Sequence, residues 1–409
     1  MKKALMIGAG SIGRGFMGQL FSQSGFEVVF LDINTELVNE LNKQHSYPIK
    51  IVENDRSYEI LVENVRAVNA KDIGQVAEEI ASSDVMSTAV GVNILPMIAK
   101  PIAEGLKLRW QKKNMKPLNI IVCENLLKAN NYLEKLVRNE LKAIEASHLD
   151  KTVGFVETSV ARNVPVMTTE MQEGNPLRIN AEEYCVLPLD KKSIKGEMPE
   201  IINMKLVHPF DFYIKKKLFI HNMAHATASY LGFQKGLKYL WEAWKIPAIK
   251  LITYHAMIES SIALSLDSNS SLVKILDYPE NITYRFSNKK LGITIERLGS
   301  DPARKLSEND RLVGPAKLCL KHGIKPVYLC IGISSAFFYK SNNDPSASKV
   351  QKLLSEEGIN KALSEYCNIN PFEKLGEIVI EFYKMIRDKY SWDDILEKAE
   401  AIKNEGIII

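Results

Sequence analysis

The sequence predicts an α/β domain with a parallel β-sheet, followed by a mainly α-helical domain. In the first half of the chain, short apolar runs alternate with polar helical stretches, which is the pattern of βαβ units. Beyond about residue 195, apolar residues recur instead at helical intervals. A length of 409 residues is sufficient for two domains of ordinary size.

Four strands are predicted in the first half, each from an apolar run that ends in small or polar residues. Their sequences are KALMIGAG, EVVFLDI, DVMSTAV and LNIIVCEN. Helical patterns cover residues 12–24, 36–43 and 71–83. Because helices separate successive strands, we expect the strands to run parallel in one sheet.

The change of pattern sets the predicted domain boundary. Residues 185–201, CVLPLDKKSIKGEMPEI, separate the strand-rich part from long helical stretches such as LWEAWKIPAIKLITYHAMIESSIALSL and GEIVIEFYKMIRDKY. The last stretch, SWDDILEKAEAIKNEGIII, predicts one more helix with an apolar tip. We therefore expect one domain over residues 1–195 and a second over residues 196–409.

Composition excludes several classes of protein. Hydrophobic residues make up 46% of the chain and charged residues 25%, and the formal net charge of +4 is too small and dispersed for a nucleic-acid partner. The five cysteines form no CxxC pair, which favours a reducing compartment and argues against metal binding by cysteine. No run approaches the roughly 18 apolar residues of a membrane helix. We expect a cytoplasmic protein without a membrane partner.

A glycine-rich turn follows the first predicted strand. GAGSIG places Gly8, Gly10 and Gly13 in the GxGxxG spacing, between a strand and a helix. The first glycine permits the tight turn, the second lets the backbone approach a pyrophosphate, and the third allows close helix–strand packing. Ser11 and Ile12 open the helix, whose free N–H groups favour anions. The pattern predicts a Rossmann-type dinucleotide site.

An acid at the end of the second strand indicates which dinucleotide binds. Asp32 lies 19 residues beyond Gly13, where a carboxylate can accept hydrogen bonds from the ribose hydroxyls and repels a 2′-phosphate, so NAD is favoured over NADP. The alternative is a simple glycine turn with Asp32 capping the next helix. Ala89 and Val90 end another strand and are predicted to let the cofactor lie close. Arg14 either contacts phosphate or is solvated.

The helical stretch KKKLFIHNMAHATASYLG, residues 215–232, carries three polar side chains among apolar ones. On an α-helix, Asn222 lies at about 140° from Lys217 and His225 at about 80°, so the three share one half of the surface. Burying them is costly unless partners or a substrate satisfy them. The pattern favours a functional site over a core histidine bonded to a carbonyl.

These three residue types suit hydride transfer. Oxidising a secondary alcohol requires a base for the hydroxyl proton, and a lysine beside apolar groups can serve near neutral pH. Amide donors stabilise the alkoxide. No metal is expected, because the histidines offer no third ligand at useful spacing. His221 and His225 are four apart and can in principle chelate, but we interpret them as one outward and one inward residue.

The pattern Lys-x4-Asn-x2-His resembles that of the polyol-specific long-chain dehydrogenases, the mannitol dehydrogenase family. The resemblance runs from residue 1 to roughly 385. It includes GAGSIGRGFMG, HSYPI at 45–49, PLNIIVCEN at 117–125, KLFIHNMAHATASYLG, and RKLSENDRLVGP at 304–315. It implies a Rossmann-type domain followed by a helical substrate domain.

The resemblance also implies roles for individual residues. Lys217 is expected to be the general base in oxidation and the general acid in reduction. Asn222, with Asn125 from the CEN motif, is expected to form the oxyanion hole. His225 is expected to hydrogen-bond a substrate hydroxyl or to orient the lysine.

Two arginines are predicted to bind substrate. Arg285 in YRFSN resembles a substrate-contacting arginine of the family, and its alternative is a surface salt bridge. Arg162 lies in ETSVARNVP, where the family usually has a Val-Asp-Arg run and this chain has Ala161 in place of the acid. Lys215 and Lys216, beside the expected base, either attract a phosphate or form a solvated face.

The resemblance implies NAD-dependent, metal-independent interconversion of D-mannitol 1-phosphate and D-fructose 6-phosphate. Because of Ala161, another polyol, sugar phosphate or hexuronate stays open as the substrate. A non-catalytic NAD-binding protein of the same fold is the remaining alternative. The expected partner is therefore a small polyol or sugar phosphate, and the expected state is a monomer or a weak homo-oligomer.

Overall fold

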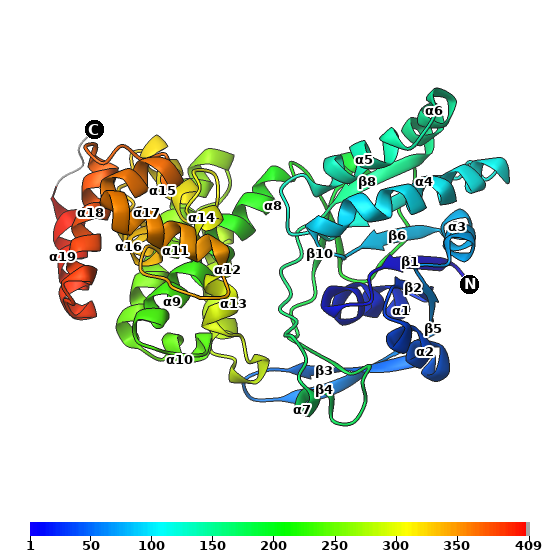
Figure 1. Cartoon of the computed structure of the whole chain (residues 1–409), viewed down its shortest axis with the longest axis horizontal. Coiled ribbons are helices and arrows are strands. Elements are labelled where there is room, and N and C mark those ends of the chain that lie inside the picture. Colours follow the sequence, from blue (N-terminus) through cyan, green and yellow to red (C-terminus); the bar gives the residue numbers. More distant parts are fainter. Residues whose placement is uncertain (406–409) are drawn as a thin grey trace. The chain divides into compact units, whose positions relative to one another are not determined.

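The protein is described by a computed structural model that covers residues 1–405. Contacts divide the chain into two compact units, the first running from Met1 to Tyr213 and the second beginning at Ile214 (Figure 1). The first unit is α/β and the second is helical, so the predicted fold class is confirmed. The predicted apolar tip, residues 406–409, lies outside the described residues.

The division lies 18 residues beyond the expected boundary at 195, since 213 − 195 = 18. Residues after 195 stay with the first unit because a strand follows the segment in which the sequence pattern changes. This strand, β11 (Met204–Val207), pairs in parallel with β10 (Leu187–Asp190) of the same unit. Local periodicity does not report such long-range pairing, which explains the different position.

The first unit is built on a six-stranded parallel sheet with the order β5-β2-β1-β6-β7-β8. Numbered along the chain within this sheet, the order is that of a doubly wound dinucleotide-binding fold. The strands are β1 (Lys3–Ile7), β2 (Glu27–Asp32), β5 (Val65–Asn69), β6 (Val85–Thr88), β7 (Leu118–Val122) and β8 (Val153–Glu157).

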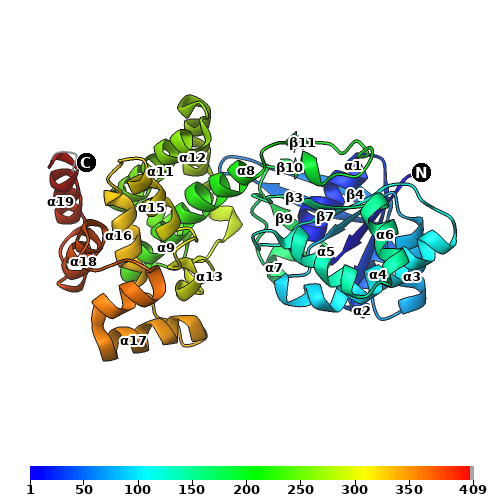
Figure 2. The ribbon, with the colours of Figure 1, turned by 90° about the horizontal axis from the view of Figure 1, so that it is seen from above.

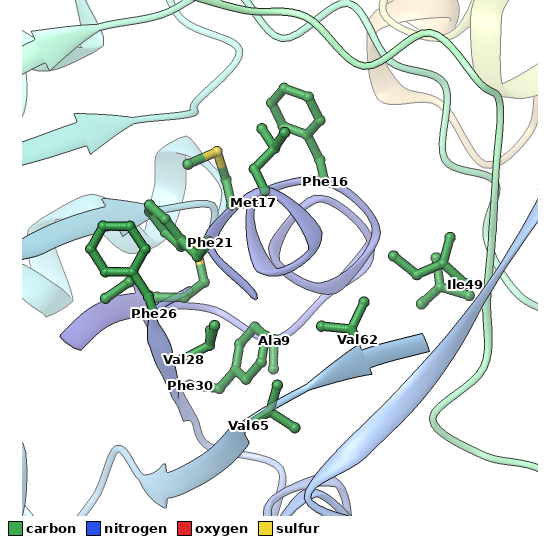
Figure 3. Close-up of a cluster of buried hydrophobic side chains, with 14 of the residues drawn as sticks. Ala9, Phe16, Met17, Phe21, Phe26, Val28, Phe30, Ile49, Val62 and Val65 are labelled. Atoms are coloured by element: carbon green, nitrogen blue, oxygen red, sulfur yellow. The ribbon is translucent and has the colours of Figure 1, made fainter. Parts of the chain in front are cut away.

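Alternating strand residues bury two separate cores, one on each face of this sheet. Phe30 belongs to one core and its neighbour Leu31 to the other. The first core receives the helical residues Phe16 and Met17, which Figure 3 shows with Phe30. Helices α1 (Gln19–Gln23) and α2 (Thr35–Gln44) lie on this face.

The second face of the sheet is covered by longer helices. Their apolar residues join the core of Leu31 and Val122. These helices are α3 (Ile73–Ser82), α4 (Leu95–Gln111), α5 (Ala129–Asn139) and α6 (Ala143–Thr152). In Figure 2, α4 and α5 lie side by side, in agreement with their direct contacts. Helices on both faces explain why the strands are apolar throughout.

A second, three-stranded sheet interrupts the βαβ order and was not predicted from the sequence. The hairpin β3 (Ser46–Val52) and β4 (Ser57–Glu63) is inserted between α2 and β5, and β9 (Ile179–Ala181) pairs in parallel with β3. The short helix α7 (Thr169–Gln172) precedes β9. The strand order of this sheet is β4-β3-β9, and it joins residues more than 120 positions apart, since Ile49 is paired with Ile179.

The second unit consists of helices around α9 and α16, which are almost fully buried. Neighbouring helices α11, α13 and α18 pack against this pair. Helix α8 (Asp211–Lys216) spans the division after Tyr213. The helices that follow are α9 (Met223–Gln234), α10 (Leu240–Trp244), α11 (Pro247–Ser268), α12 (Leu272–Phe286), α13 (Ile295–Gly299), α14 (Pro302–Lys305), α15 (Val313–Lys321), α16 (Val327–Ala336), α17 (Pro345–Ala362), α18 (Lys374–Arg387) and α19 (Trp392–Asn404).

Helix α19 confirms the predicted last helix. Ser391 caps its first turn, and Trp392, Ile395 and Ile402 are buried where it packs against α11 and α16. Shorter turns are η2 (Val92–Ile94), η3 (Lys191–Ser193) and η5 (Lys289–Leu291), and wider π-helical turns are η1 (Gly13–Gly18), η4 (Lys217–Asn222) and η6 (Leu363–Cys367). Within residues 1–405, every helix is too short or too polar to cross a membrane.

Candidate functional site

The glycine turn after β1 has the geometry that the spacing predicts. Gly8 has φ = 96°, and a Cβ there would lie 2.6 Å from the carbonyl oxygen of Ala89. A Cβ on Gly13 would overlap the carbonyl oxygen of Gly8. At Gly10, in contrast, a Cβ would meet nothing within 4 Å. The fold therefore requires Gly8 and Gly13, whereas Gly10 leaves open space beside the backbone, as a pyrophosphate site requires.

The helix that follows the turn begins with a π-helical segment, η1. Ser11 and Ile12 precede it and are half-buried, so they open the helix beside the turn. The hydroxyl of Tyr47 donates to the carbonyl of Arg14 at 2.8 Å inside this segment. π-Helical turns occur frequently at functional sites, and the first N–H groups of the helix remain available to an anion.

Arg14 has a different role from the two that were considered. Its guanidinium donates to the carbonyl of Ala9 at 2.7 Å and to the carbonyl of Leu177 at 2.5 Å. The side chain is buried, and this burial lowers the pKa of Arg14. Arg14 therefore ties the glycine turn to the loop before β9 and is not a solvated cation.

Asp32 ends β2 and holds the glycine turn. Its Oδ2 accepts from the backbone N–H of Ala9 at 2.8 Å, and its Oδ1 accepts from the N–H of Asn34 at 2.9 Å. The cap of α2 is Asn34, whose side chain accepts from the N–H of Leu37 at 3.1 Å. The helix-capping alternative for Asp32 therefore does not hold. Each carboxylate oxygen keeps acceptor capacity for a ribose hydroxyl.

A second carboxylate, which was not predicted from the sequence as a site residue, holds the loop after β6. Glu124 accepts from the backbone N–H groups of Val90 at 2.9 Å and Gly91 at 2.8 Å. The preceding residue, Ala89, continues the sheet pairing through its N–H to the carbonyl of Ile7 at 2.9 Å. The signal in the sequence was the CEN motif, in which Glu124 directly precedes Asn125.

Asn125 lies at the same carboxyl edge of the sheet, in the loop between β7 and α5, and its side chain is exposed. The loop is held on both sides of this residue. Glu124 binds the loop after β6, and Glu157 accepts from the backbone N–H of Lys128 at 3.0 Å. Burial raises the pKa of Glu157. An exposed amide in a loop with two fixed ends can donate to a ligand at this edge.

In the second unit, Lys217 and Asn222 are the first and last residues of the π-helical turn η4. This corrects the α-helical geometry assumed above. A π-helix is closed by i→i+5 hydrogen bonds, such as that from the N–H of Met223 to the carbonyl of Leu218. Residues five apart therefore lie closer together around the helix axis than the roughly 140° that separates them in an α-helix. Ser260 supports the turn by donating to the carbonyl of Phe219 at 2.8 Å.

The turn η4 leads into α9, where His225 is buried, whereas Lys217 and Asn222 are half-buried. His221 is also buried, so the interpretation of one outward and one inward histidine was wrong. Residues four apart share a helix face, and the two rings lie 4.5 Å apart between centroids. His225 stacks on Phe286 at 4.5 Å.

Both imidazoles are in an apolar and cationic environment. Burial, and then the charge of Arg285, hold the pKa values of His221 and His225 well below the ordinary value of histidine. The Nδ1 of His221 lies 3.2 Å from the hydroxyl of Tyr278. Within residues 1–405, the Nε2 atoms of both histidines have no hydrogen-bond partner. Two neutral rings thus each present a buried nitrogen that a ligand can satisfy.

The two predicted substrate arginines lie in different surroundings. Arg285 is in the last turn of α12 and is 4% exposed, so the surface salt-bridge alternative does not hold. Arg162 is also buried, but it donates to the carbonyl of Glu182 at 2.8 Å, to the carbonyl of Gly15 at 2.9 Å and to Gln19 at 2.7 Å. Arg162 therefore supports the packing of the first unit, and its expected role in substrate binding stays a prediction.

The lysines beside Lys217 have partners of their own. Lys215 forms an ion pair with Asp267 at 2.7 Å, and the Nζ of Lys216 lies 4.5 Å from the centroid of the Tyr278 ring. Because the charge of Lys215 is paired with Asp267, the structure does not favour the phosphate-attracting role for this lysine.

Both halves of the chain match family models of known proteins. The mannitol dehydrogenase Rossmann domain matches residues 2–203, and the mannitol dehydrogenase C-terminal domain matches residues 209–386. The chain belongs to the mannitol dehydrogenase family. The gap between the two matches lies close to the division after Tyr213.

Curated members of the mannitol dehydrogenase family are similar over nearly the whole chain. The mannitol-1-phosphate 5-dehydrogenase of Thermoanaerobacter pseudethanolicus is 35% identical over 391 residues, which cover 95% of this chain and 99% of the relative. The mannitol-1-phosphate 5-dehydrogenase of Bacillus subtilis is 36% identical over 382 residues, covering 92% of this chain and 98% of the relative.

Solved structures show that the mannitol dehydrogenase fold is shared at low sequence identity. A substrate-free D-sorbitol dehydrogenase has a TM-score of 0.78 at 15% identity, covering 95% of this chain and 94% of its own. The mannitol 2-dehydrogenase of Pseudomonas fluorescens, solved as a ternary complex with NAD and D-mannitol, has a TM-score of 0.74 at 15% identity, covering 99% and 95%.

Proposed function

We propose that this protein is an NAD-dependent dehydrogenase that interconverts D-mannitol 1-phosphate and D-fructose 6-phosphate without a metal. The observation that carries the proposal is the similarity, at 34–36% identity over nearly the full chain, to mannitol-1-phosphate 5-dehydrogenases. The glycine turn with Asp32 and the Lys217–Asn222 turn supply the residue types that this chemistry needs.

The glycine turn fits NAD. Open space beside Gly10 and the helix start at Ser11 and Ile12 suit a pyrophosphate. Asp32 suits the ribose hydroxyls, and Gly8, Gly13, Ala89 and Val90 shape the backbone around the turn. When bound, NAD accepts the hydride at C4 of its nicotinamide ring and returns it in the reverse direction.

The residues of the chain move the proton and stabilise the charge. We assign to Lys217 the removal of the hydroxyl proton in oxidation and its return in reduction. The amides of Asn222 and Asn125 are assigned to the developing alkoxide, which they stabilise as fixed donors. His225, neutral because of its burial, is assigned to a substrate hydroxyl, and Arg285 to the polar end of the substrate.

The finer properties of this enzyme are part of the same proposal. The substrate is a small polyol phosphate, the protein is cytoplasmic, and it acts as a monomer or a weak homo-oligomer. Another polyol, sugar phosphate or hexuronate is the second candidate substrate.

The test is oxidation of NADH with fructose 6-phosphate, followed by absorbance. Lys217→Ala is expected to lower kcat by about 10²–10⁴-fold, the usual contribution of a general acid. Lys215→Ala is the matched control, because Lys215 is two positions away and pairs with Asp267. If Lys217→Ala turns over like the control, the assigned acid and base are wrong.

A substrate panel then separates the two candidate substrates. Fructose 6-phosphate, free fructose and a hexuronate are compared at equal concentration with NADH and with NADPH. We expect the largest kcat/KM for the phosphorylated ketose with NADH. Preference for an unphosphorylated compound rejects the assigned substrate but keeps the reaction class. NAD binding without turnover of any member of the panel identifies a non-catalytic NAD-binding protein.

A further inference from the structure

The segment RKLSENDRLVGP, residues 304–315, is part of the family resemblance but has no role in the mechanism above. It connects α14 to α15 and lies against the turn that carries Lys217. A Cβ on Gly314 would lie 2.8 Å from ring atoms of Phe219, which is inside η4. The N–H of Gly314 donates to the carbonyl of Asp310 at 2.9 Å. The segment is therefore packed directly on the proposed catalytic turn.

Two cations of this segment, Lys305 and Arg311, are buried, and they differ in their hydrogen-bond partners. Lys305 donates through Nζ to the carbonyl of Leu298 at 2.5 Å and to the carbonyl of Ser300. These carbonyls close the end of α13, so Lys305 supports the fold. Burial, and then the charge of Arg311, lower the pKa of Lys305 to about 7.

Arg311 keeps most of its donors unused. The backbone N–H and the Nε of Arg311 both donate to Oδ1 of Asp310, at 2.6 and 2.7 Å. Its two Nη atoms form no hydrogen bond within residues 1–405, although the residue is only 8% exposed. Arg304 differs, since it is exposed and its guanidinium binds both Asp301 and Asp310. A buried guanidinium with two terminal donors left over is suited to bind an anion.

The surroundings of Arg311 favour an anion of high charge. Burial is the main cause of the lowered pKa of His225, and the charges of four nearby cations lower this pKa further. These cations are Arg285, Arg311, Arg297 and Lys305. Two acids lie close to this group, Asp310 in the segment and Asp301 just before it, and they are bound by Arg304 and Arg311. The buried Nε2 atoms of His221 and His225, which lack partners among the described residues, are an independent sign of a missing ligand.

We infer that Arg311 binds the phosphate group of the substrate and sets the preference for phosphorylated over free polyols. This inference rests on the proposed function and names the residue that reads the substrate class. The planar guanidinium can give two parallel hydrogen bonds to phosphate oxygens, whereas a free hydroxymethyl group accepts such a pair poorly. Asp310 holds the guanidinium in place through Nε and leaves the other edge to the ligand.

The test compares Arg311→Gln with Arg304→Gln, which removes an exposed arginine that binds the same Asp310. For Arg311→Gln, kcat/KM with fructose 6-phosphate is expected to fall by about 100-fold, as the loss of charge-assisted hydrogen bonds implies. With free fructose it is expected to stay within about 2-fold. Arg304→Gln is expected to change neither value by more than about 3-fold. Arg311→Lys, which keeps the charge, is expected to recover part of the loss.

Inorganic phosphate provides a second measurement that does not depend on turnover. Its dissociation constant, measured by calorimetry on the full chain, is expected to rise at least tenfold in Arg311→Gln and not in Arg304→Gln. Equal losses with fructose 6-phosphate and fructose, or unchanged phosphate affinity, would overturn the inference. If the wild type turns over no polyol phosphate, the proposed function fails, whereas phosphate binding that depends on Arg311 still supports the anion site.

Discussion

Gly13 lies so close to Gly8 that a Cβ on Gly13 would overlap the carbonyl oxygen of Gly8. The two glycines therefore determine the path of the turn before any ligand is considered. Gly10, between them, has open space where its Cβ would be. The fold therefore requires glycine at positions 8 and 13, whereas glycine at position 10 leaves space for a cofactor.

We expect Gly13→Ala to lower the free energy of unfolding by about 1–3 kcal/mol, because the added methyl group forces the turn apart. NAD affinity should fall with it. Gly10→Ala should leave the unfolding free energy within about 0.5 kcal/mol and weaken NAD binding alone, since its methyl group occupies the space beside the backbone. Thermal unfolding of both variants measures the change in stability, and titration with NAD measures the change in affinity. Equal destabilisation by both changes contradicts the geometry.

Asp32 is expected to decide between NAD and NADP. Asp32→Asn removes the negative charge and keeps an oxygen that can accept from the N–H of Ala9. The kcat/KM with NADH should fall by roughly 10–100-fold, as expected for the loss of hydrogen bonds to a charged group, and the discrimination against NADPH should shrink. The measurement is the ratio of the two kcat/KM values. An unchanged ratio would show that another group reads the ribose.

Glu124 is expected to position the loop after β6. Glu124→Ala leaves the N–H groups of Val90 and Gly91 without their acceptor, so the loop should loosen and the dissociation constant of NAD should rise by about tenfold. Glu124→Gln keeps one acceptor oxygen and should have a smaller effect. Calorimetric titration with NAD measures both variants. The proposal fails if the two variants bind NAD as tightly as the wild type.

The buried histidines should make the protein less stable in mild acid. The pKa values of His221 and His225 are held well below the ordinary value near 6.5, mainly by burial. As the pH falls below about 6.5, the unfolded chain takes up protons that the folded chain refuses, so the free energy of unfolding decreases. His221→Phe should reduce this slope by at most about 1.4 kcal/mol per pH unit. Urea unfolding of the wild type and of His221→Phe between pH 5 and pH 8 measures how the unfolding free energy depends on pH. The same slope in both proteins would contradict this prediction.

Glu259 should have the opposite effect on stability. Its carboxylate lies in the core of the second unit and accepts from the N–H groups of Tyr328 and Leu329 at 3.0 Å, and burial raises its pKa to about 8. A raised folded pKa means that stability present below about pH 4.5 is lost as the pH rises to about 8. Glu259→Gln, which cannot ionise, should remove this decline.

The measurement for Glu259 is urea unfolding at intervals from pH 5 to pH 8.5. Glu259→Ala serves as the control, because it leaves the first N–H groups of α16 without an acceptor and should be destabilised at every pH. A decline of equal size in the wild type and in Glu259→Gln would mean that another group causes it.

Much of the first unit could be predicted from the sequence because its signals are local. The alternation of apolar strands and helices predicted the parallel sheet, and the spacing of Gly8, Gly10 and Gly13 predicted a turn whose geometry the structure then showed. The three-stranded sheet was missed, and the pairing of its strands β3 and β9 joins residues more than 120 positions apart in the chain.

The roles of the polar side chains could be predicted less well. Arg14 was expected either to contact phosphate or to be solvated, whereas it donates to backbone carbonyls inside the first unit. Arg162 also donates to backbone carbonyls there, and its expected role in substrate binding stays a prediction. Glu124 and Arg311 were given no role, although one fastens a loop and the other is buried with donors to spare. The partners of these groups lie far along the chain, where a sequence pattern carries no information about distance.

Residue type and spacing by themselves determined the order of strands and helices, the division into an α/β and a helical part, and the identity of the glycine turn, because these depend on neighbours within about one helical turn or one strand. Tertiary packing alone decided that the turn from Lys217 to Asn222 is π-helical and that His221 and His225 are both buried. The physical reason is that Ser260 and Phe286, which belong to other helices, supply the hydrogen bond and the apolar surface that make this conformation stable.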